Sequence, residues 1–303
     1  MYFKEYDRCI LCPRECGVNR NRGEKGVCGM SSGLILGRAA LHMWEEPCLS
    51  GEKGSGTVFF SGCPLRCVYC QNHRLSRGRE GVEVQPERLT EIFLELQQKG
   101  AHNINLVTGV HYAPHIVYSV REARRRGLSI PIVYNSSGYE SVFTLKMLDG
   151  TVDIYLPDFK YIENESAKCL SGAPDYPITA KKAIDEMLRQ KPRPLFDKTG
   201  LLKSGVLVRH LCLPSFSDES VKIMDYLHAY KDRIFLSIMS QYTPVKNVSG
   251  NLRLSKPLTG REYDKVVDHC IALGMENAYI QEGSAADESF IPCFDGEGVF
   301  PKK

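Results

Sequence analysis

Residues 56–73 read GTVFFSGCPLRCVYCQNH, a β-branched and aromatic run followed by a loop that carries Cys63, Cys67 and Cys70 with the spacing C-x3-C-x2-C. A short apolar run of this kind predicts a buried strand. A closed zinc site or a closed iron–sulfur cluster takes four protein ligands. Three cysteines directly after a strand therefore predict a metal centre in which one coordination position is left for a substrate or cofactor.

A repeating pattern starts at this strand and continues to about residue 281. Short apolar runs alternate with longer amphipathic ones, which predicts an α/β fold with parallel strands joined by crossover helices. We expect strands at 56–61, 104–108, 131–135, 152–158, 205–213, 233–239 and 277–281. We expect helices at 86–99, 113–126, 141–148, 178–190, 218–230 and 261–273.

A doubly wound sheet and a barrel both satisfy this alternation. The nucleotide-binding motifs GxGxxG and GxxxxGK[ST] follow none of the expected strands, so the sequence does not support folds of those types. In parallel barrels the catalytic groups lie on loops that leave the carboxyl ends of the strands. The cysteine loop occupies such a position, directly after the first expected strand.

The composition is that of a globular chain, since 43% of the 303 residues are hydrophobic and 25% are charged. The 39 basic and 36 acidic residues give a net charge of +3, which offers no electrostatic argument for binding nucleic acid or a membrane. No apolar stretch is long enough to span a bilayer, and the first residues lack the pattern of a signal peptide. We therefore expect a cytoplasmic protein.

Twelve cysteines are many for this length, and seven of them fall in two groups. In a reducing compartment such groups are more often metal ligands than disulfides. Apart from the loop triplet, four thiols lie in a segment rich in glycine and charge, and they suit either a structural zinc or a complete second cluster. These four are Cys9, Cys12, Cys16 and Cys28. The remaining five, which we expect to be buried and inert, are Cys48, Cys169, Cys212, Cys270 and Cys293.

The words GCPLRCVYCQN resemble the cysteine loop of the radical S-adenosylmethionine (AdoMet) superfamily, and in particular its glycyl-radical-enzyme activases. Together with the N-terminal CxxCPRxCGVNR pattern, the chain resembles pyruvate formate-lyase-activating-enzyme-like proteins from Cys9 to about Glu282. The resemblance implies a partial parallel (β/α)6 barrel, with a [4Fe–4S] cluster on the triplet and AdoMet on its open iron. Reductive cleavage of AdoMet would then give a 5′-deoxyadenosyl radical that abstracts hydrogen from the substrate.

The same resemblance assigns roles to residues after the other strands. Tyr69 would approach the adenine, and Asn135 and Ser136 the ribose, although polar residues ending in glycine are also what an ordinary turn uses. The acid–base pair after the fourth strand would bind polar groups of AdoMet, because charged groups are not cheaply buried at a strand end. The segment VTGVH departs from the family's Gly-Gly-Glu-like motif, and a surface role for its histidine stays open. The expected cofactor contacts in these segments are Thr108, Gly109, His111, Asp158, Lys160, Arg209 and Gln241.

The activity that the resemblance implies is hydrogen abstraction from a glycine of a partner glycyl radical enzyme, with a flavodoxin- or ferredoxin-type protein as electron donor. A second possibility within the class is modification of a small molecule, a peptide or RNA. A possibility from another class is a non-catalytic binding module stabilised by zinc, with His73 as a fourth ligand beside the triplet. We expect three parts: a cysteine-rich metal-binding module at 1–50, the barrel at 51–285 and a tail at 286–303.

Overall fold

The computed structural model describes residues 1–245, 248, 251–281 and 293–300. Its strands form one sheet in the order β10-β9-β8-β6-β5-β4-β2-β1-β3, with β7 paired to β8. Seven neighbouring strands run parallel to one another, and they are β2 (Ser55–Phe60), β4 (Ile104–Val107), β5 (Ile132–Ser136), β6 (Ile154–Pro157), β8 (Leu202–Leu211), β9 (Phe235–Met239) and β10 (Ala278–Ile280). The antiparallel strands are β1 (Leu34–His42), β3 (Val82–Val84) and β7 (Leu195–Phe196).

All seven expected strands are present, and the expected α/β class with a mostly parallel sheet is confirmed. The parallel part has one strand more than the six of the expected barrel, since the short β10 pairs with β9. Strand β1 was not predicted, because glycine and arginine interrupt its apolar residues and its buried positions do not alternate. Strands β3 and β7 are only three and two residues long, too short for a period to be read.

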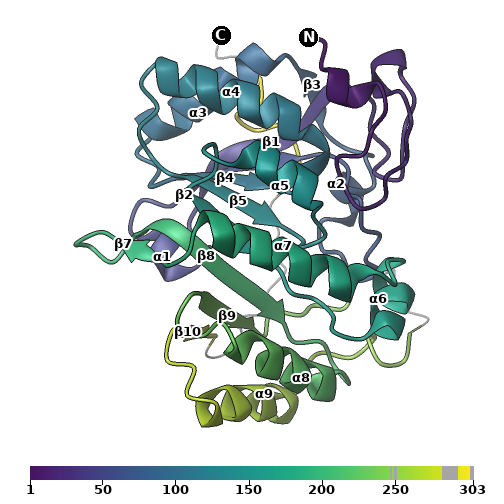
Figure 1. Ribbon diagram of the computed structural model, residues 1–303, viewed down its shortest axis with the longest axis vertical. Coiled ribbons are helices and arrows are strands. Elements are labelled where there is room, and N and C mark those ends of the chain that lie inside the picture. The colour runs from purple at the N-terminus through teal and green to yellow at the C-terminus, as the bar shows by residue number, and fades with distance from the viewer. Residues whose placement is uncertain (246–247, 249–250, 282–292, 301–303) are drawn as a thin grey trace.

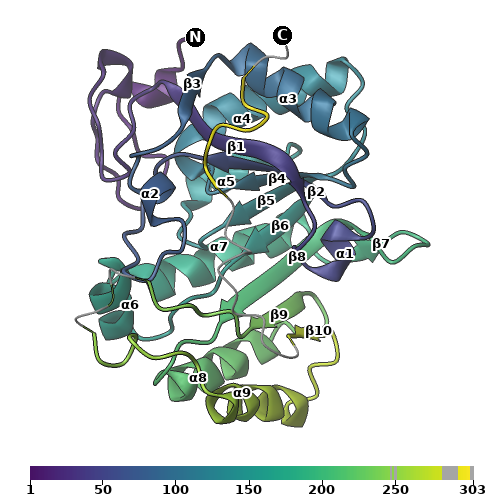
Figure 2. The ribbon, with the colours of Figure 1, turned by 180° about the vertical axis from the view of Figure 1, so that it is seen from behind.

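The helices lie mainly on one face of the sheet, in front of it in Figure 1. Those predicted from periodicity are α3 (Pro86–Gln98), α4 (Ala113–Arg125), α5 (Val142–Leu148), α7 (Tyr176–Gln190), α8 (Ser217–His228) and α9 (Gly260–Ala272). Three were not predicted, namely α1 (Pro47–Ser50), α2 (His73–Ser76) and α6 (Asn164–Ser171). Short 3-10 turns occur at Lys4–Tyr6, Arg20–Arg22 and Val110–Tyr112. Seen from behind, β1 and α1 lie in front of the other strands (Figure 2).

Alternation along the parallel strands divides their side chains between two environments. One set packs under the helices in the main hydrophobic core, as Tyr134, Tyr155 and Val208 do. The opposite set faces the inner side of the sheet, where α1 covers it. There Cys48 and Leu49 pack in one apolar cluster with Val133, Ile154, Leu156, Leu202 and Leu207. Helix α1 therefore closes one end of the inner space with apolar side chains.

The division of the chain at residue 50 stays a prediction, but the sheet does not break there. Strand β1 lies inside the expected N-terminal module and pairs from Leu36 to His42 with β2. The expected C-terminal tail is described only at 293–300; its other residues, and 282–285 of the expected barrel, lie outside the described residues. The described part packs on the barrel, since the Arg88 guanidinium donates to the backbone oxygens of Gly298, Val299 and Phe300.

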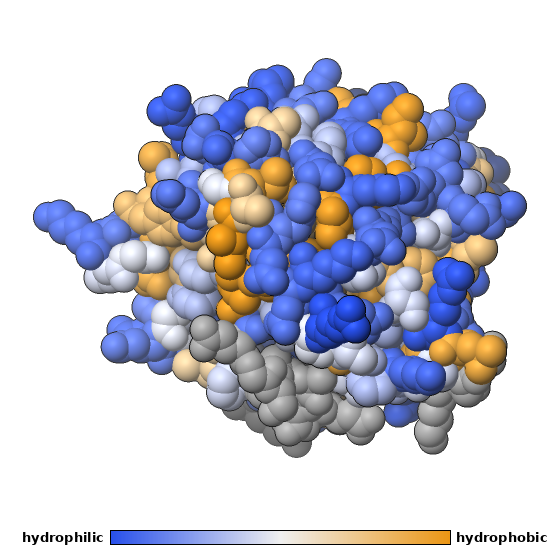
Figure 3. Space-filling view, turned by 90° about the horizontal axis from the view of Figure 1, so that it is seen from below, coloured by the Kyte–Doolittle hydropathy of each residue, from blue (hydrophilic) through white to orange (hydrophobic). Residues whose placement is uncertain are grey.

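None of the described helices is long and apolar enough to cross a membrane. The end of the molecule formed by α8 and α9 is mainly hydrophilic, with smaller apolar groups between the charged residues (Figure 3). No disulfide joins any of the twelve cysteines, all of which fall in the described ranges. The expectation of burial for the five scattered cysteines holds for Cys48, Cys212 and Cys270 and is wrong for Cys169 and Cys293, which are exposed.

Candidate functional site

The cysteine loop leaves the carboxyl end of β2, beside the ends of the neighbouring parallel strands. Its three cysteines are partly exposed as residues, and Cys67 lies close enough to Cys63 and Cys70 to raise the pKa of both of those thiols. Burial raises the pKa of the Cys63 thiol well above its usual value, and Cys67 and Cys70 add to that rise. Burial is also the main reason that the pKa of Cys70 is raised. A positive metal cluster would reverse this effect, because coordination deprotonates a thiol.

Each thiol of the triplet has a hydrogen-bonding neighbour. The backbone N–H groups of Leu65 and Asn72 point to Cys63 and Cys70 respectively and lower their pKa values. The Ser171 hydroxyl donates to Cys67 Sγ at 2.9 Å. Donors to sulfur stabilise the thiolate form and tune an iron–sulfur cluster. The donor set therefore fits a [4Fe–4S] cluster held by three cysteines.

The loop is tied to the N-terminal segment at its start. Gly62 has a φ of +86°, and a Cβ there would lie 2.5 Å from Met30 Cγ and 2.8 Å from the Cys28 carbonyl oxygen. Only glycine satisfies both the left-handed backbone and this close approach. Arg14 donates to the Pro64 oxygen at 2.9 Å and to the Gly172 oxygen at 2.7 Å. The two cysteine-bearing segments therefore pack directly against each other.

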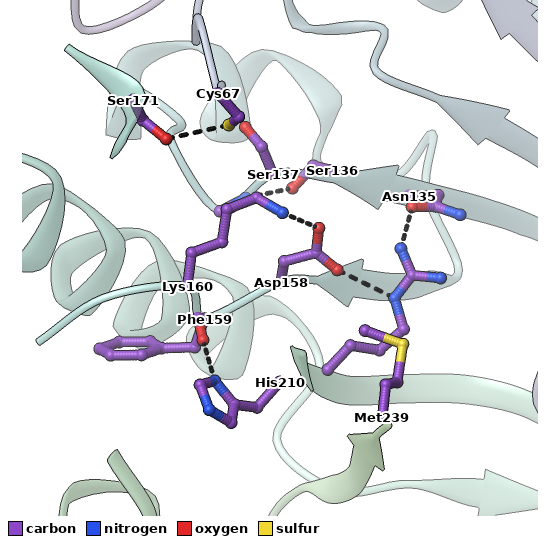
Figure 4. Close-up of polar contacts among 12 residues, drawn as sticks. Cys67, Asn135, Ser136, Ser137, Asp158, Phe159, Lys160, Ser171, His210 and Met239 are labelled. Atoms are coloured by element: carbon purple, nitrogen blue, oxygen red, sulfur yellow. Dashed lines mark hydrogen bonds and ion pairs between the residues drawn. The ribbon is translucent and has the colours of Figure 1, made fainter. Parts of the chain in front are cut away.

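A cluster of charged side chains lies below the loop, at the ends of β6 and β8 (Figure 4). Asp158 accepts from Lys160 Nζ at 2.7 Å and from Arg209 Nε at 3.0 Å. Arg209 Nη2 also donates to Asn135 Oδ1 at 2.6 Å, which links the cluster to β5. Burial alone would raise the pKa of Asp158, but Lys160 and Arg209 outweigh it and hold that pKa below its usual value. Asp158 is therefore an ionised carboxylate fixed between two cations.

Two of the expected residues after β4 and β5 shape the backbone of the site. Thr108 adopts a φ of +60°, a strained conformation for a β-branched residue, and its N–H donates to the Asn135 oxygen. A Cβ on Gly109 would lie 2.5 Å from Ile116 Cδ1, so a larger residue there would have to displace the end of that side chain. The Ser136 hydroxyl accepts from the Gly138 N–H at 3.2 Å. An ordinary turn at Asn135–Gly138 and a role in binding are thus compatible.

Of the remaining expected residues, His111 contacts the start of the loop, whereas Tyr69 and Gln241 make their contacts elsewhere. Tyr69 is buried, and its hydroxyl lies 2.6 Å from that of Tyr161. Gln241 accepts from Gln71 at its backbone oxygen and lines a cavity beside Arg209. His111 is fully buried rather than on the surface, with Nε2 2.8 Å from the Ser61 oxygen. Its contacts are with the loop start and with the N-terminal segment, not with the Asp158 cluster.

Two carboxylates that belong to this site were not predicted from the sequence. Glu45 and Glu46 follow β1 and reach the inner side of the sheet, where the Glu45 carboxylate accepts from Arg209 Nη1 at 3.3 Å. Burial raises the pKa of both groups, while Arg209 lowers it. The only signal was an adjacent acidic pair in HMWEEPC, which without the strand before it resembles an exposed turn.

The first cysteine group is also brought together. Cys9, Cys12 and Cys28 are buried and Cys16 is partly exposed, and burial raises the pKa of Cys12 to about 12, with the other three thiols adding to the rise. Backbone N–H groups of Arg14, Val27 and Met30 point to Cys12, Cys16 and Cys28. In the part of the chain that the structure describes, no three His, Cys, Asp or Glu side chains stand close enough to hold one metal ion. The thiols of either group would have to turn toward a shared cluster on binding it.

Two comparisons of sequence and one of structure relate this chain to known proteins. The model of the radical SAM superfamily matches residues 57–227, more than half of the chain. An uncharacterized protein of Methanocaldococcus jannaschii is 28% identical over 271 residues, which cover 87% of this chain and 74% of that protein. The pyruvate formate-lyase-activating enzyme of Clostridium pasteurianum is 24% identical over 205 residues, 66% of this chain and 78% of that enzyme.

Among solved structures, the fold is similar to that of the FeFe-hydrogenase maturase HydG from Carboxydothermus hydrogenoformans, with a TM-score of 0.52 and 13% identity. The match covers 73% of this chain and 52% of the maturase, so the chain spans about half of the maturase's length. At this identity the likeness concerns the fold alone.

Proposed function

The chain belongs to the radical SAM superfamily, and from that premise we propose that it abstracts a hydrogen atom from a glycine of a partner glycyl radical enzyme. The family implies a [4Fe–4S] cluster and AdoMet. When bound and reduced, the cluster would supply the one electron that cleaves AdoMet, and AdoMet would supply the group that can remove a hydrogen atom. The observation that supports the finer role is the similarity, at 24% identity, to a pyruvate formate-lyase-activating enzyme.

The three cysteines of the loop, Cys63, Cys67 and Cys70, would hold the [4Fe–4S] cluster. Lys160 and Arg209 are cations beside Asp158, and their side chains are only 17% and 15% exposed, respectively. Because little water reaches them, they would interact more strongly with the polar groups of AdoMet than exposed charges would. The Asp158–Lys160 and Asp158–Arg209 pairs are already formed. The three charged side chains therefore need little rearrangement to bind the polar groups of AdoMet. Asn135 and Gln241 border the same region and would orient the nucleoside, as the family resemblance implies.

We propose further that Cys9, Cys12, Cys16 and Cys28 hold a second metal centre, either a [4Fe–4S] cluster or zinc. Four neighbouring thiols, three of them with backbone N–H donors, support this proposal, because the segment has few apolar residues and its main apolar side chains are Tyr6 and Leu11. A flavodoxin- or ferredoxin-type protein would supply electrons, and the protein would act in the cytoplasm. Metal analysis of the anaerobically purified chain separates iron from zinc at this centre.

The test is anaerobic incubation of the reconstituted protein with AdoMet, dithionite and pyruvate formate-lyase as candidate partner. A doublet of a glycyl radical in the EPR spectrum, absent without AdoMet, is the expected result. If 5′-deoxyadenosine forms without any protein radical, the second candidate, modification of a small molecule, peptide or RNA, replaces the first. Absence of AdoMet cleavage in the iron-loaded protein would contradict both.

A further inference from the structure

A cavity of about 170 Å³ lies on the inner side of the sheet, next to the charged cluster. Glu45 and Glu46 line it from the turn before α1, and Arg209 lines it from β8. Strands β9 and β10 and the residues after them complete the wall with Ser237, Met239, Gln241, Tyr279 and Gln281. A volume of about 150 Å³ accepts a molecule the size of benzene. The cavity therefore suits a short group of a ligand rather than a whole nucleoside.

Glu46 is the unusual member of this wall. The residue is only 8% exposed, and its Oε2 atom has no hydrogen-bond partner among the described residues. The Ser237 hydroxyl bonds to the same carboxylate, and Arg209 is near, but neither satisfies that oxygen. A buried carboxylate oxygen without a donor destabilises the folded state. Such a group is expected where a bound ligand supplies the missing donor.

The charges around the cavity point to the nature of that donor. Three carboxylates, those of Glu45, Glu46 and Asp158, face two cations, Arg209 and Lys160. Arg209 is shared between Glu45, Asp158 and Asn135, and Lys160 is engaged by Asp158. With all five groups ionised, one negative charge is left over beside Glu46. A cationic donor would balance this charge, whereas an anion would add to it.

We propose that this cavity binds the ammonium group of a ligand, with the Glu46 carboxylate as its acceptor. The ligand class is a primary amine on a short aliphatic chain, such as a basic side chain or an amino acid. This inference deepens the proposed function, on which it rests, because the cavity adjoins the residues assigned to AdoMet. The source of the ammonium group is the substrate, because the amino group of AdoMet would be a ligand of the open iron of the cluster.

The experiment uses the whole reconstituted protein and n-butylammonium chloride as probe, with binding measured by calorimetry. We expect binding to the wild type, at least tenfold weaker binding to Glu46→Gln, and no change for Glu276→Gln, which removes an exposed carboxylate elsewhere. The neutral isostere n-butanol should bind no better to the wild type than to Glu46→Gln. Equal affinity of butylammonium for the wild type and Glu46→Gln would overturn the proposal.

A second pair of variants does not depend on the folding of Glu46→Gln. Met239→Lys places an ammonium inside the cavity and should abolish butylammonium binding, whereas Met239→Leu should retain it. Unchanged binding to Met239→Lys would overturn the proposal as well. Both substitutions conserve most of the side-chain volume, so packing of the wall is kept.

A further arm tests the source of the ammonium group. Butylammonium should bind in the presence of saturating AdoMet, and Glu46→Gln should change the AdoMet affinity by less than twofold. Displacement of butylammonium by AdoMet, with AdoMet binding at least tenfold weaker in Glu46→Gln, would overturn a substrate site. A protein that binds butylammonium in this way but shows no AdoMet-dependent change in its EPR spectrum would contradict the proposed function alone.

Discussion

The two cysteine groups differ in what they leave accessible. In the N-terminal group, three of the four cysteine residues are buried; in the loop after β2, all three residues are partly exposed, although the Cys63 and Cys70 sulfurs themselves point into buried surroundings that raise their pKa. The number of thiols and their exposure change together. Four mostly buried thiols suit a metal that is fully ligated by the protein, and three partly exposed ones suit a centre that meets another molecule. Neighbouring segments of similar composition can thus be assigned different tasks by ligand count and access.

The two groups are nevertheless not independent. The Cys28 carbonyl lies against Gly62 at the start of the loop. Arg14, between Cys12 and Cys16, donates to the Pro64 oxygen in the loop and to the Gly172 oxygen at the end of α6. The Gly172 and Ser171 oxygens that Arg14 contacts belong to the same turn whose Ser171 hydroxyl donates to Cys67. The N-terminal segment therefore positions the loop, in addition to carrying the ligands of the metal that we propose for it.

The largest contrast is expected from removing one thiol of each group. Cys67→Ala should reduce AdoMet cleavage by more than about 100-fold, because a cluster with two protein ligands is not retained. Cys12→Ala should lower metal content at the N-terminal group and leave the triplet's EPR signal in place. The measurements are 5′-deoxyadenosine by chromatography, iron content and EPR. Equal loss of the triplet signal in both variants would show that the two sites form only together.

A second contrast concerns two buried carboxyls that follow neighbouring strands, Glu140 after β5 and Asp158 after β6. Burial raises the pKa of Glu140 to about 8, whereas Lys160 and Arg209 keep Asp158 ionised. Glu140 ionises in the unfolded chain near the ordinary pKa of 4.5 but stays protonated in the folded one, so stability falls as pH rises from about 5 to about 8. The expected loss is up to about 4 kcal/mol.

Glu140→Gln is the matched control for this pH dependence. Its amide can still accept from the Tyr134 hydroxyl, which is 3.0 Å from the carboxyl oxygen in the native chain, but it does not titrate. Urea unfolding at several pH values should therefore give a flatter profile for the variant. Parallel profiles for the two proteins would rule out Glu140 as the cause.

The contact between the groups can be tested with two glycines of almost identical φ. Gly62→Ala should destabilise the protein by about 2–3 kcal/mol, since the methyl group would overlap Met30 and the Cys28 carbonyl at a φ of +86°. Gly23 has a φ of +85° with nothing within 4 Å of the position that a methyl group would take, so Gly23→Ala should lose only about 1 kcal/mol. Denaturant unfolding measures both, and a Gly62 value no larger than the Gly23 value would count against a tight junction.

The smallest effect is expected from the arginines that cross the junction. Arg14→Ala removes bonds to three carbonyl oxygens and should lower the affinity of the loop for iron by about 10-fold. The exposed Arg66 side chain donates only to the Val27 oxygen among the residues that the structure describes, so Arg66→Ala should change iron affinity by less than about twofold. Chelator competition, followed at the visible absorbance of the cluster, gives both values. A stronger effect at Arg66 would show that its contact with Val27, rather than the contacts of Arg14, positions the loop.

The parallel strands and their helices could be predicted because each carries its own periodic pattern. Strand β1 could not, because its Gly37 and Arg38 are partnered by tail residues far along the chain: the Gly296 N–H donates to the Gly37 oxygen, and Arg38 pairs with Glu297. Glu45 and Glu46 were missed for a related reason. Their place inside the sheet follows from the course of β1, and nothing in their local sequence distinguishes them from an exposed acidic turn.

The sequence by itself determined the α/β class, the cysteine spacing and the position of the cysteine loop at the carboxyl end of a parallel strand, because periodicity and ligand spacing are local properties. Only the tertiary structure decided which charges meet: Asp158 with Arg209 across two strands, His111 with the loop start, and Glu46 without a partner for one oxygen among the described residues. Such pairings depend on the register of strands and on segments distant in sequence, so side-chain types alone do not specify them.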